Sequence, residues 1–486
     1  MREAEAELAA VCGRFKSPLA LDDRLREHIA KTARGMSVLE GSSFVYESSL
    51  PLAWQVLLSY LQQHDIVAST SPGIRYGYND LPRLLTYRFE GTESISYTDG
   101  GKVAIKGQGS GVTLEETVSK AVGELLERHF LTAYRNDDLR TSSYTDLIES
   151  GERALNPSDL NLPLASQGQR AGARKKIEEA QLRWTMTTNL ETDEETYVPA
   201  QLVFWNYDRA EGEPWLLQPT TSGGAGHFTR EEATLSALLE LIQRDGFLIY
   251  WLNSLAPKRI DPKKVSDPAV EAFLSYCERY RLQPIFLNTT TDVGVPCVTC
   301  VILDTVNEPV VAVGSAAGFD LAELILHSGD EAILTHSTTV RSDQYTLPET
   351  YMPFSDHTLR RKERLTLWRG ETMMDRFRFF ISGEMQNMSE FEKLFDAPLT
   401  IEGQTAHIHE SLARLGAGYE IYIRDIEHEV LTTLGYSVVR AIVPQLFPLY
   451  LTESSATLDS KRLKEVPAKL GYQAAQKLNP WPHPFP

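Results

Sequence analysis

The sequence predicts an α/β protein preceded by a small helical region. From about residue 91 onward, segments with strand character alternate with long helical segments, the pattern of an α/β arrangement. Within that part, three glycine-containing turns each lead into a helix with a capping residue, which predicts the same strand–turn–capped helix unit three times. Residues before about 90 have the pattern of helices joined by short turns. We therefore expect an N-terminal helical region over 1–90 and the main domain over 91–486.

Several segments of the main domain have the composition of buried strands. They are "RWTMTTNL", "TYVPAQLVFW", "PVVAVGSAAG" and "YSVVRAIVPQLFPLYL". Cys297 and Cys300 form a CxxC pair in "VGVPCVTCVILD", where the flanking Val and Ile residues indicate another buried strand. Because no second CxxC or neighbouring CxxH completes a four-ligand zinc site, we interpret both cysteines as small core residues.

The composition limits the class of function. A chain of 486 residues exceeds one ordinary core, so two or three lobes are expected. The net charge of −18 argues against nucleic-acid or anionic-membrane binding, because both need a basic surface. No apolar stretch is long enough to span a membrane, and the N-terminus lacks the pattern of a signal peptide. Four cysteines suit a reducing compartment, so we expect a cytoplasmic enzyme or enzyme subunit.

The three capped helices carry glutamates at matching positions. Their segments are 109–130, 224–247 and 318–337, and their helix-start residues are Thr113, Thr229 and Asp320. One glutamate lies three residues after each helix-start residue (Glu116, Glu232, Glu323). A second glutamate lies eleven residues after the same helix-start residue (Glu124, Glu240, Glu331). At the helical spacing of about 100° per residue, each helix therefore presents one stripe that bears carboxylates.

Converging carboxylates repel one another unless cations lie between them. Oxygen ligands of this kind suit Mg²⁺, which usually brings phosphates as co-ligands. Arg128 and Arg244, one turn after a glutamate, can reach phosphate oxygens bidentately. No GxxxxGK[ST] sequence for a P-loop occurs. In one helix alone, such glutamates indicate an ordinary solvent-exposed face. Glutamates at the same distances from the cap in three helices favour a nucleotide–Mg²⁺ pocket.

Two of these segments resemble the signature helices of the YcaO family. "GSGVTLEETVSKAVGELLER" is similar to a GKG turn followed by a helix ending ExxER, and "GAGHFTREEATLSALLELIQRD" to a helix reading EA…ALxExxERD. The ending "PHPFP" resembles the PxPxP terminus of the azoline-forming cyclodehydratases in that family. The similarity covers roughly residues 91–486. It implies a YcaO-type α/β fold with mixed sheets, in which the strand–turn–capped helix units surround an ATP and Mg²⁺ pocket.

The resemblance implies ATP-dependent modification of a ribosomal precursor peptide that carries a leader. In such enzymes a Cys, Ser or Thr side chain attacks the preceding backbone carbonyl, ATP phosphorylates the resulting oxygen, and loss of phosphate gives a thiazoline or oxazoline. Phosphorylation is needed because an amide oxygen is a very poor leaving group. The chain resembles the D protein of these systems, which works with a separate E1-like C protein. Many systems add a flavin-dependent azoline dehydrogenase, and pairing as a homodimer is also compatible with the resemblance.

The resemblance also implies roles for individual residues. The implied Mg²⁺ and nucleotide ligands are Glu124, Glu127, Glu232 and Glu240, and the further nucleotide contacts are Gln243, Arg244 and Arg341. Two positions depart from the family's pattern: Ser110 stands where the turn has Lys, and Gln243 stands where the second helix has Glu. An amide oxygen can ligate Mg²⁺ without adding negative charge, so a weaker metal site is expected.

The C-terminal "PWPHPFP" over residues 480–486 has prolines at alternate positions. Such a segment favours an extended polyproline II path that loses little entropy when it docks. With the resemblance in view, we assign Pro482, Pro484 and Pro486 to the catalytic site, where the rod would hold the Pro486 carboxylate near the reacting backbone as a base or orienting group. His483 is expected to be a spacer. An accidental proline-rich end is the alternative, and residues appended after Pro486 would distinguish the two.

Three other functions stay open at this stage. Thioamide or amidine formation would use the same ATP site but change the substrate mass differently. A non-catalytic scaffold, suggested by Ser110 and Gln243, would release no phosphate. An unrelated metal-dependent hydrolase built on the carboxylates would turn over without ATP.

Overall fold

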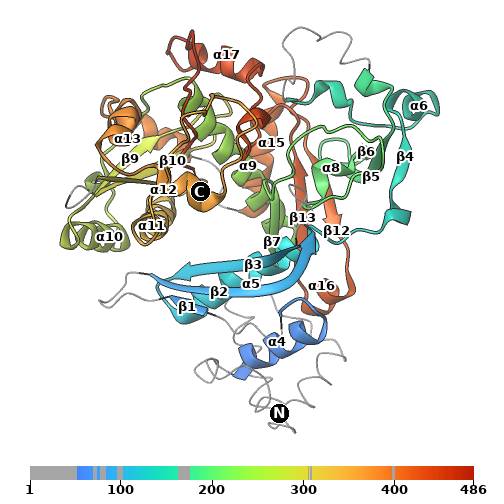
Figure 1. The fold of residues 1–486 in the computed structure, drawn as a ribbon, viewed down its shortest axis with the longest axis horizontal. Coiled ribbons are helices and arrows are strands. Elements are labelled where there is room, and N and C mark those ends of the chain that lie inside the picture. Colours follow the sequence, from blue (N-terminus) through green and yellow to red (C-terminus); the bar gives the residue numbers. More distant parts are fainter. Residues whose placement is uncertain are drawn as a thin grey trace.

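The computed structural model describes residues 52–68, 74–76, 84–95, 102–162, 176–304, 306, 309–396 and 400–485. Three sheets are formed within these ranges, and helices lie between and around them (Figure 1). The predicted α/β class is confirmed. Pairing between the named strands is antiparallel, and the parallel pairing expected of mixed sheets is limited to the isolated bridges Ala154–Tyr197 and Arg259–Met385.

The first sheet has the order β1 (Ile74–Tyr76), β2 (Leu85–Ile95), β3 (Lys102–Gly111). The second has the order β11 (Val310–Ala317), β10 (Cys297–Asp304), β9 (Leu282–Asn288), β8 (Lys258–Ile260). The third has the order β4 (Arg140–Ser142), β5 (Leu182–Asn189), β12 (Tyr422–Ile426), β13 (Ser437–Ile442), β7 (Gly224–His227), and β6 (Glu195–Pro199) pairs with β5.

The longer helices are α4 (Leu52–Gln63), α5 (Leu114–Phe130), α9 (Arg230–Leu252), α10 (Pro268–Arg279), α11 (Leu321–Val340), α15 (Ile401–Ala413) and α17 (Lys461–Lys469). Shorter ones are α6 (Tyr144–Glu149), α8 (Ala200–Val203), α12 (Arg361–Leu367), α13 (Glu371–Phe377), α14 (Met388–Phe391) and α16 (Glu429–Leu434). None of the described helices is both long and apolar enough to cross a lipid bilayer.

Helix α9 lies at the centre of the molecule, between the second and third sheets (Figure 1). It packs against β7 and β13 on one side and against β10 and β11 on the other. Its first turn is acidic, which complements the helix dipole, whereas the residues from Phe247 to Leu252 are all buried. A helix that is apolar all round at one end is stable only inside a core. The polar half of α9 is therefore the half that can form a site.

The first and third of the predicted units bring a strand unusually close to its helix. A Cβ atom at Gly109 would overlap the backbone of α5 at Thr117 and Ala121, and one at Gly314 would overlap the backbone of α11 at Ser328. Larger residues would hold the helices away from the strands. The glycines thus allow helix side chains to reach the backbone of the neighbouring strand.

Two local expectations change in the structure. The domain boundary expected near residue 90 falls inside β2. Among the described residues before that position, α4 is helical, whereas β1 and the start of β2 are strands. The "TYVPAQLVFW" segment is a strand only as far as Pro199, because α8 begins at Ala200. Residues 1–51 lie outside the described part of the chain.

The interpretation of Cys297 and Cys300 as core residues is confirmed. Both are fully buried in β10 with free thiols. An odd spacing within a strand places them on opposite faces, and they belong to different hydrophobic clusters, so they cannot bind one metal ion together. Burial raises the pKa of both thiols, which suppresses the reactive thiolate.

We therefore expect a thiol-specific reagent to leave Cys297 and Cys300 unlabelled in the native protein. In guanidinium both should react rapidly, because unfolding exposes them. Replacing Cys12 with Ser simplifies the mass spectrum. Rapid labelling of Cys297 or Cys300 in this variant in its native state would contradict the assignment of both residues to the core.

Candidate active site

One glutamate in each of α5, α9 and α11 accepts a hydrogen bond from the strand segment that precedes its helix. The pairs are Gln108 N with Glu124 Oε2, Gly223 N with Glu240 Oε2 at 2.6 Å, and Ser315 N with Glu331 Oε2 at 2.7 Å. These are the glutamates that stand eleven residues after each cap. The repeat seen in the sequence is therefore a repeat of structure, in which each carboxylate is held against a strand.

The predicted caps explain why the three helices share this register. The side chains of Thr113, Thr229 and Asp320 each accept a hydrogen bond from the backbone N–H three residues later. A cap fixes the first turn of a helix, and it typically stabilises the helix by about 1 kcal/mol. With the start fixed, the glutamate three turns on points toward the same place in each unit.

Glu127 shows that α5 and α9 bring their carboxylates together. Desolvation raises the pKa of Glu127 well above its ordinary value, and the negative charges of Glu240 and Glu124 raise it further. The guanidinium groups of Arg128 and Arg244 act in the opposite direction. Four residues predicted from the sequence as ligands, Glu124, Glu127, Glu240 and Arg244, thus interact in one cluster, together with Arg128.

Glu331 adds the third helix to this group. Desolvation raises the pKa of Glu331, and Glu240 also raises it, whereas the hydrogen bond from Ser315 lowers it. We call Glu124, Glu127, Glu240 and Glu331 the carboxylate cluster. It joins α5, α9 and α11.

Two arginines form ion pairs with glutamates of the cluster. Arg128 Nη2 lies 2.7 Å from Glu124 Oε1, and Arg244 Nη2 lies 2.5 Å from Glu240 Oε1. Arg244 Nη1 also donates to Ser222 Oγ at 2.6 Å. Both guanidinium groups lie one helical turn after their glutamates, where they offer N–H donors to an anion beside the cluster.

Two more arginines were not identified from the sequence. Arg361 begins α12, where desolvation lowers its pKa and Glu124 and Glu331 raise it. Arg440 is buried in β13, where desolvation lowers its pKa to about 10, and Glu240 opposes that shift. Arg440 is the one charged residue in the apolar run "YSVVRAIVP", a signal that could have been used. Arg361 lies in "LRRKERL", which has the pattern of an ordinary surface helix.

Gln243 has a role that a glutamate cannot fill. Its Nε2 donates to the carbonyl oxygen of Ser315 at 2.8 Å, and Ser315 N donates to Glu331. A carboxylate at this position would face that carbonyl without a proton to donate. Gln243, at the position where the family's pattern has Glu, therefore connects α9 to β11 through this hydrogen bond.

Glu232 lies at the start of α9, apart from the other predicted ligands. Its Oε2 accepts from Thr229 Oγ1 at 2.9 Å and lies 2.6 Å from His227 Nδ1. Eight residues of helix separate it from Glu240, a rise of about 12 Å. Its described contacts are those of a helix cap.

Arg341 ends α11 and lines a cleft between the first sheet, α11 and α12. The cleft has about 1170 Å³ of empty space, and its lining includes the basic residues Arg88, Arg341 and Lys362. Hydroxyl groups of Ser337 and Thr338 also line it. Gln108 is part of the lining, and its backbone N–H binds Glu124, so the carboxylate cluster borders this space. We call it the basic cleft.

The C-terminal segment is docked in the core. Residues from Pro482 to Phe485 are buried. Trp251 Nε1 donates to the carbonyl oxygen of Trp481 at 3.1 Å, and the Phe485 ring lies 4.9 Å from that of Phe247. Pro486 lies outside the described residues, so the position of its carboxylate stays a prediction.

His483 is suited to the spacer role. Its Nε2 lies 2.9 Å from the carbonyl oxygen of Tyr450, and desolvation lowers its pKa well below the ordinary value, so the ring is neutral. The charges of Arg364 and Arg244 lower that pKa further. The influence of Arg244 shows that the docked segment lies near the carboxylate cluster.

The side chains present fit Mg²⁺ that arrives with a nucleotide. Within the described ranges, no three His, Cys, Asp or Glu side chains form a ready metal-binding group. Mg²⁺ is usually held by one or two carboxylates together with phosphate oxygens and water. The carboxylate cluster provides such oxygen ligands, and its neighbouring arginines suit the phosphates. Because the carboxylates raise one another's pKa, a divalent cation between them would reduce their mutual repulsion.

The raised pKa of Glu127 predicts a pH dependence of stability. A carboxyl whose pKa is higher in the folded state contributes stability that is present below the unfolded value of 4.5 and is lost as pH rises through the folded value. We therefore expect Glu127→Gln to raise the melting temperature of the metal-free protein at pH 8 relative to wild type, and to raise it less at pH 5. Comparing the two proteins cancels the titrating groups that do not interact with Glu127. An equal effect at both pH values would contradict the assignment.

A family model described as YcaO cyclodehydratase, ATP- and Mg²⁺-binding, matches residues 108–447. This range holds all three strand–turn–helix units apart from the start of β3. Two curated relatives are uncharacterised proteins. One, from Methanothermobacter thermautotrophicus, is 27% identical over 41% of this chain and 48% of its own length. The other, from Rhizobium leguminosarum and described as lying in the tfuA 3′ region, is 25% identical over 40% of this chain and 44% of its own length. The matches thus span about half the length of each relative.

Solved structures share the fold. A heterocyclase in complex with substrate and cofactor has a TM-score of 0.67 at 19% identity, over 88% of this chain and 57% of that one. YcaO from Methanopyrus kandleri, bound with AMPPCP and Mg²⁺, has a TM-score of 0.54 at 19% identity, over 81% and 91%. A chain of the E. coli microcin synthetase McbBCD complex has a TM-score of 0.52 at 16% identity, over 77% and 88%.

Proposed function

The chain belongs to the YcaO family, whose domain binds ATP and Mg²⁺, and from this premise we propose that it is an ATP-dependent cyclodehydratase of a ribosomal precursor peptide. A Cys, Ser or Thr side chain of the peptide adds to the preceding amide carbonyl. The resulting oxygen takes the γ-phosphoryl group of ATP, and phosphate then leaves to give a thiazoline or oxazoline and ADP. The observation that supports this proposal best is the convergence of three strand-bound glutamates and two arginines at one place.

The basic cleft is the proposed site of ATP. Its three basic side chains suit phosphates, and its border with Glu124 supports a position of those phosphates beside the carboxylate cluster. Arg341 lies ten residues of helix beyond Glu331, a rise of about 15 Å, so we assign it to the outer part of the nucleotide. Arg128, Arg244 and Arg361 are the proposed contacts to the transferred phosphoryl group.

The docked C-terminal segment supports azoline formation in particular. Pro482 and Pro484 are buried close enough to Arg244 for its charge to act on His483 between them. We propose that the segment places the Pro486 carboxylate where it can accept a proton from the reacting backbone. In this proposal an E1-like C protein binds the leader and delivers the peptide. A flavin-dependent azoline dehydrogenase and a second copy of the chain are further candidate partners.

The test is incubation of the chain with ATP, Mg²⁺, an E1-like C protein and a Cys-, Ser- and Thr-rich peptide encoded near its gene. Loss of one water mass per modified residue, together with equimolar phosphate, is the expected result. An unchanged peptide mass in the presence of ATP hydrolysis would count against cyclodehydration.

A second candidate is thioamide formation, in which sulfur replaces the amide oxygen. The Rhizobium relative described as lying in the tfuA 3′ region favours it, since that neighbourhood hints at thioamidation. Supplying sulfide in place of the C protein separates the two reactions, because thioamidation exchanges oxygen for sulfur and no water mass is lost.

A further inference from the structure

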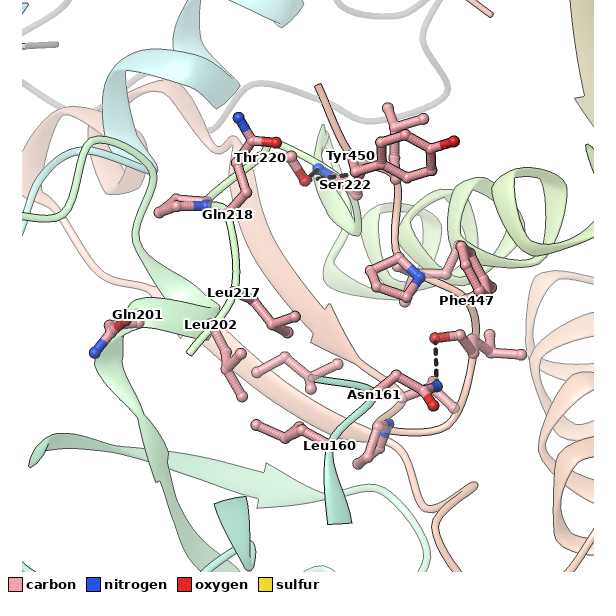
Figure 2. A pocket seen from close by; sticks show the side chains of 18 of the residues that line it. Leu160, Asn161, Gln201, Leu202, Leu217, Gln218, Thr220, Ser222, Phe447 and Tyr450 are labelled. Carbon is pink, nitrogen blue, oxygen red and sulfur yellow. Dashed lines mark hydrogen bonds between the residues drawn. The ribbon is translucent and has the colours of Figure 1, made fainter. Parts of the chain in front are cut away.

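A second cleft, drawn in Figure 2, is lined by Ser222, whose side chain binds Arg244. Its lining comes mainly from residues 217–222 and residues 440–450. Figure 2 shows Leu160, Leu202 and Leu217 pointing toward one another at one end, and Thr220 and Ser222 at the other. We call it the leucine cleft. Nothing in the function proposed above uses it.

Two residues connect the leucine cleft to the carboxylate cluster. Ser222 lines the cleft, and its Oγ accepts the hydrogen bond from Arg244 Nη1. Arg440 also lines the cleft, and the charges of Glu240 and Glu127 act on it. A ligand in the leucine cleft therefore lies beside Arg244 and the carboxylate cluster.

Arg440 carries an unused donor. Its side chain is 7% exposed, and its Nε donates to the carbonyl oxygen of Leu202 at 3.0 Å. Its Nη1 is buried without a hydrogen-bond partner among the described residues. A buried guanidinium N–H that lacks an acceptor is costly, so it indicates an acceptor that a ligand supplies.

The lining of the leucine cleft favours a peptide over a nucleotide. Arg440 is the one charged side chain in it, whereas the basic cleft has three. One cation does not match a triphosphate, but it does match one carbonyl oxygen. Uncharged polar side chains also line the cleft, and beside them the leucines, Phe447 and Ile442 form an aliphatic and aromatic surface that suits an uncharged side chain.

We propose that the leucine cleft binds the substrate peptide. An apolar side chain next to the modified residue fills the end lined by leucines, and Arg440 Nη1 donates a hydrogen bond to the adjacent backbone carbonyl oxygen. The peptide amide and the nucleotide then meet beside Arg244 and Glu240. This inference rests on the proposed function, and it adds a preference for an apolar neighbour of the modified residue.

Photo-crosslinking tests the proposal. The probe is the N-acetylated, C-amidated peptide Gly-photoleucine-Cys-Gly, irradiated with the full chain in the presence of Mg²⁺ and AMPPCP. We expect crosslinks at residues 217–222 and 440–450, suppressed by excess Gly-Leu-Cys-Gly but not by Gly-Asp-Cys-Gly. Leu217→Trp, which fills the cleft, should reduce them by about tenfold or more, because burial of one leucine side chain is lost.

Arg440 is tested as a positioning residue in the same assay. Arg440→Met should reduce crosslinking by roughly tenfold, the effect of losing a hydrogen bond from a charged donor, and Arg440→Lys should restore part of it. Crosslinks elsewhere, no crosslinks, or crosslinks unaffected by Leu217→Trp would overturn the inference. Binding of AMPPCP is measured in parallel: if it fails, the proposed function falls, whereas normal binding with misplaced crosslinks removes this inference alone.

Discussion

Glu240→Gln is expected to reduce ATP turnover by about 100-fold, the upper end of the loss that follows removal of a group supporting a metal site. Glu240 accepts the backbone N–H of Gly223 and pairs with Arg244, and it acts electrostatically on Glu127 and Glu331. A glutamine loses the charge that a Mg²⁺ ion needs and leaves Arg244 without its carboxylate. Phosphate release measured with saturating ATP and Mg²⁺ checks the effect, and Glu124→Gln should behave in the same way.

Glu231→Gln is the matched control for Glu240→Gln. Glu231 is exposed in the first turn of the same helix, so the same change of charge there should leave turnover within about twofold of wild type, as is usual for a surface substitution. Melting temperatures of both variants show whether the fold persists. Unchanged turnover in both Glu124→Gln and Glu240→Gln would remove the carboxylate cluster as the site of ATP chemistry.

Deletion of residues 482–486 is expected to abolish peptide modification while AMPPCP still binds. The deletion removes the docked segment and the carboxylate proposed to accept a proton, but it leaves the carboxylate cluster and the basic cleft in place. It also empties the space that Phe485 fills beside Phe247, and a Phe to Ala change in a core costs about 3–5 kcal/mol. A loss of stability alone could therefore mimic the effect.

Phe485→Ala separates the two causes, because it empties the space beside Phe247 and keeps Pro482, Pro484 and Pro486. If both variants lose similar thermal stability but only the deletion stops modification, the end of the segment acts in catalysis. Equal loss of modification in both variants would reduce the segment to a packing element.

Local patterns in the sequence predicted the parts of the site that depend on one helix. The caps at Thr113, Thr229 and Asp320 fix the register of three helices, and register alone brings Glu124 and Glu240 to the strands before them. Such information lies within about 20 consecutive residues, so a sequence pattern contains it.

Other parts of the site depend on segments far apart in the chain. Arg361 and Arg440 reach the carboxylate cluster only because α12 and β13 pack beside it, and no local pattern specifies that packing. Glu232 shares a helix stripe with Glu240, but its described contacts are with Thr229 and His227 at the start of α9. Gln243 was interpreted as a weakened ligand, and its bond to Ser315 became visible only with β11 in place.

Transfer of a labelled oxygen tests the central claim most directly. The substrate peptide is prepared with ¹⁸O in the amide carbonyl before the reactive Cys, and the phosphate released with ATP and Mg²⁺ is analysed by mass spectrometry. Phosphorylation of the backbone oxygen predicts one ¹⁸O atom in each phosphate. Phosphate that carries oxygen only from ATP and solvent, with the label retained in the peptide, would contradict the account.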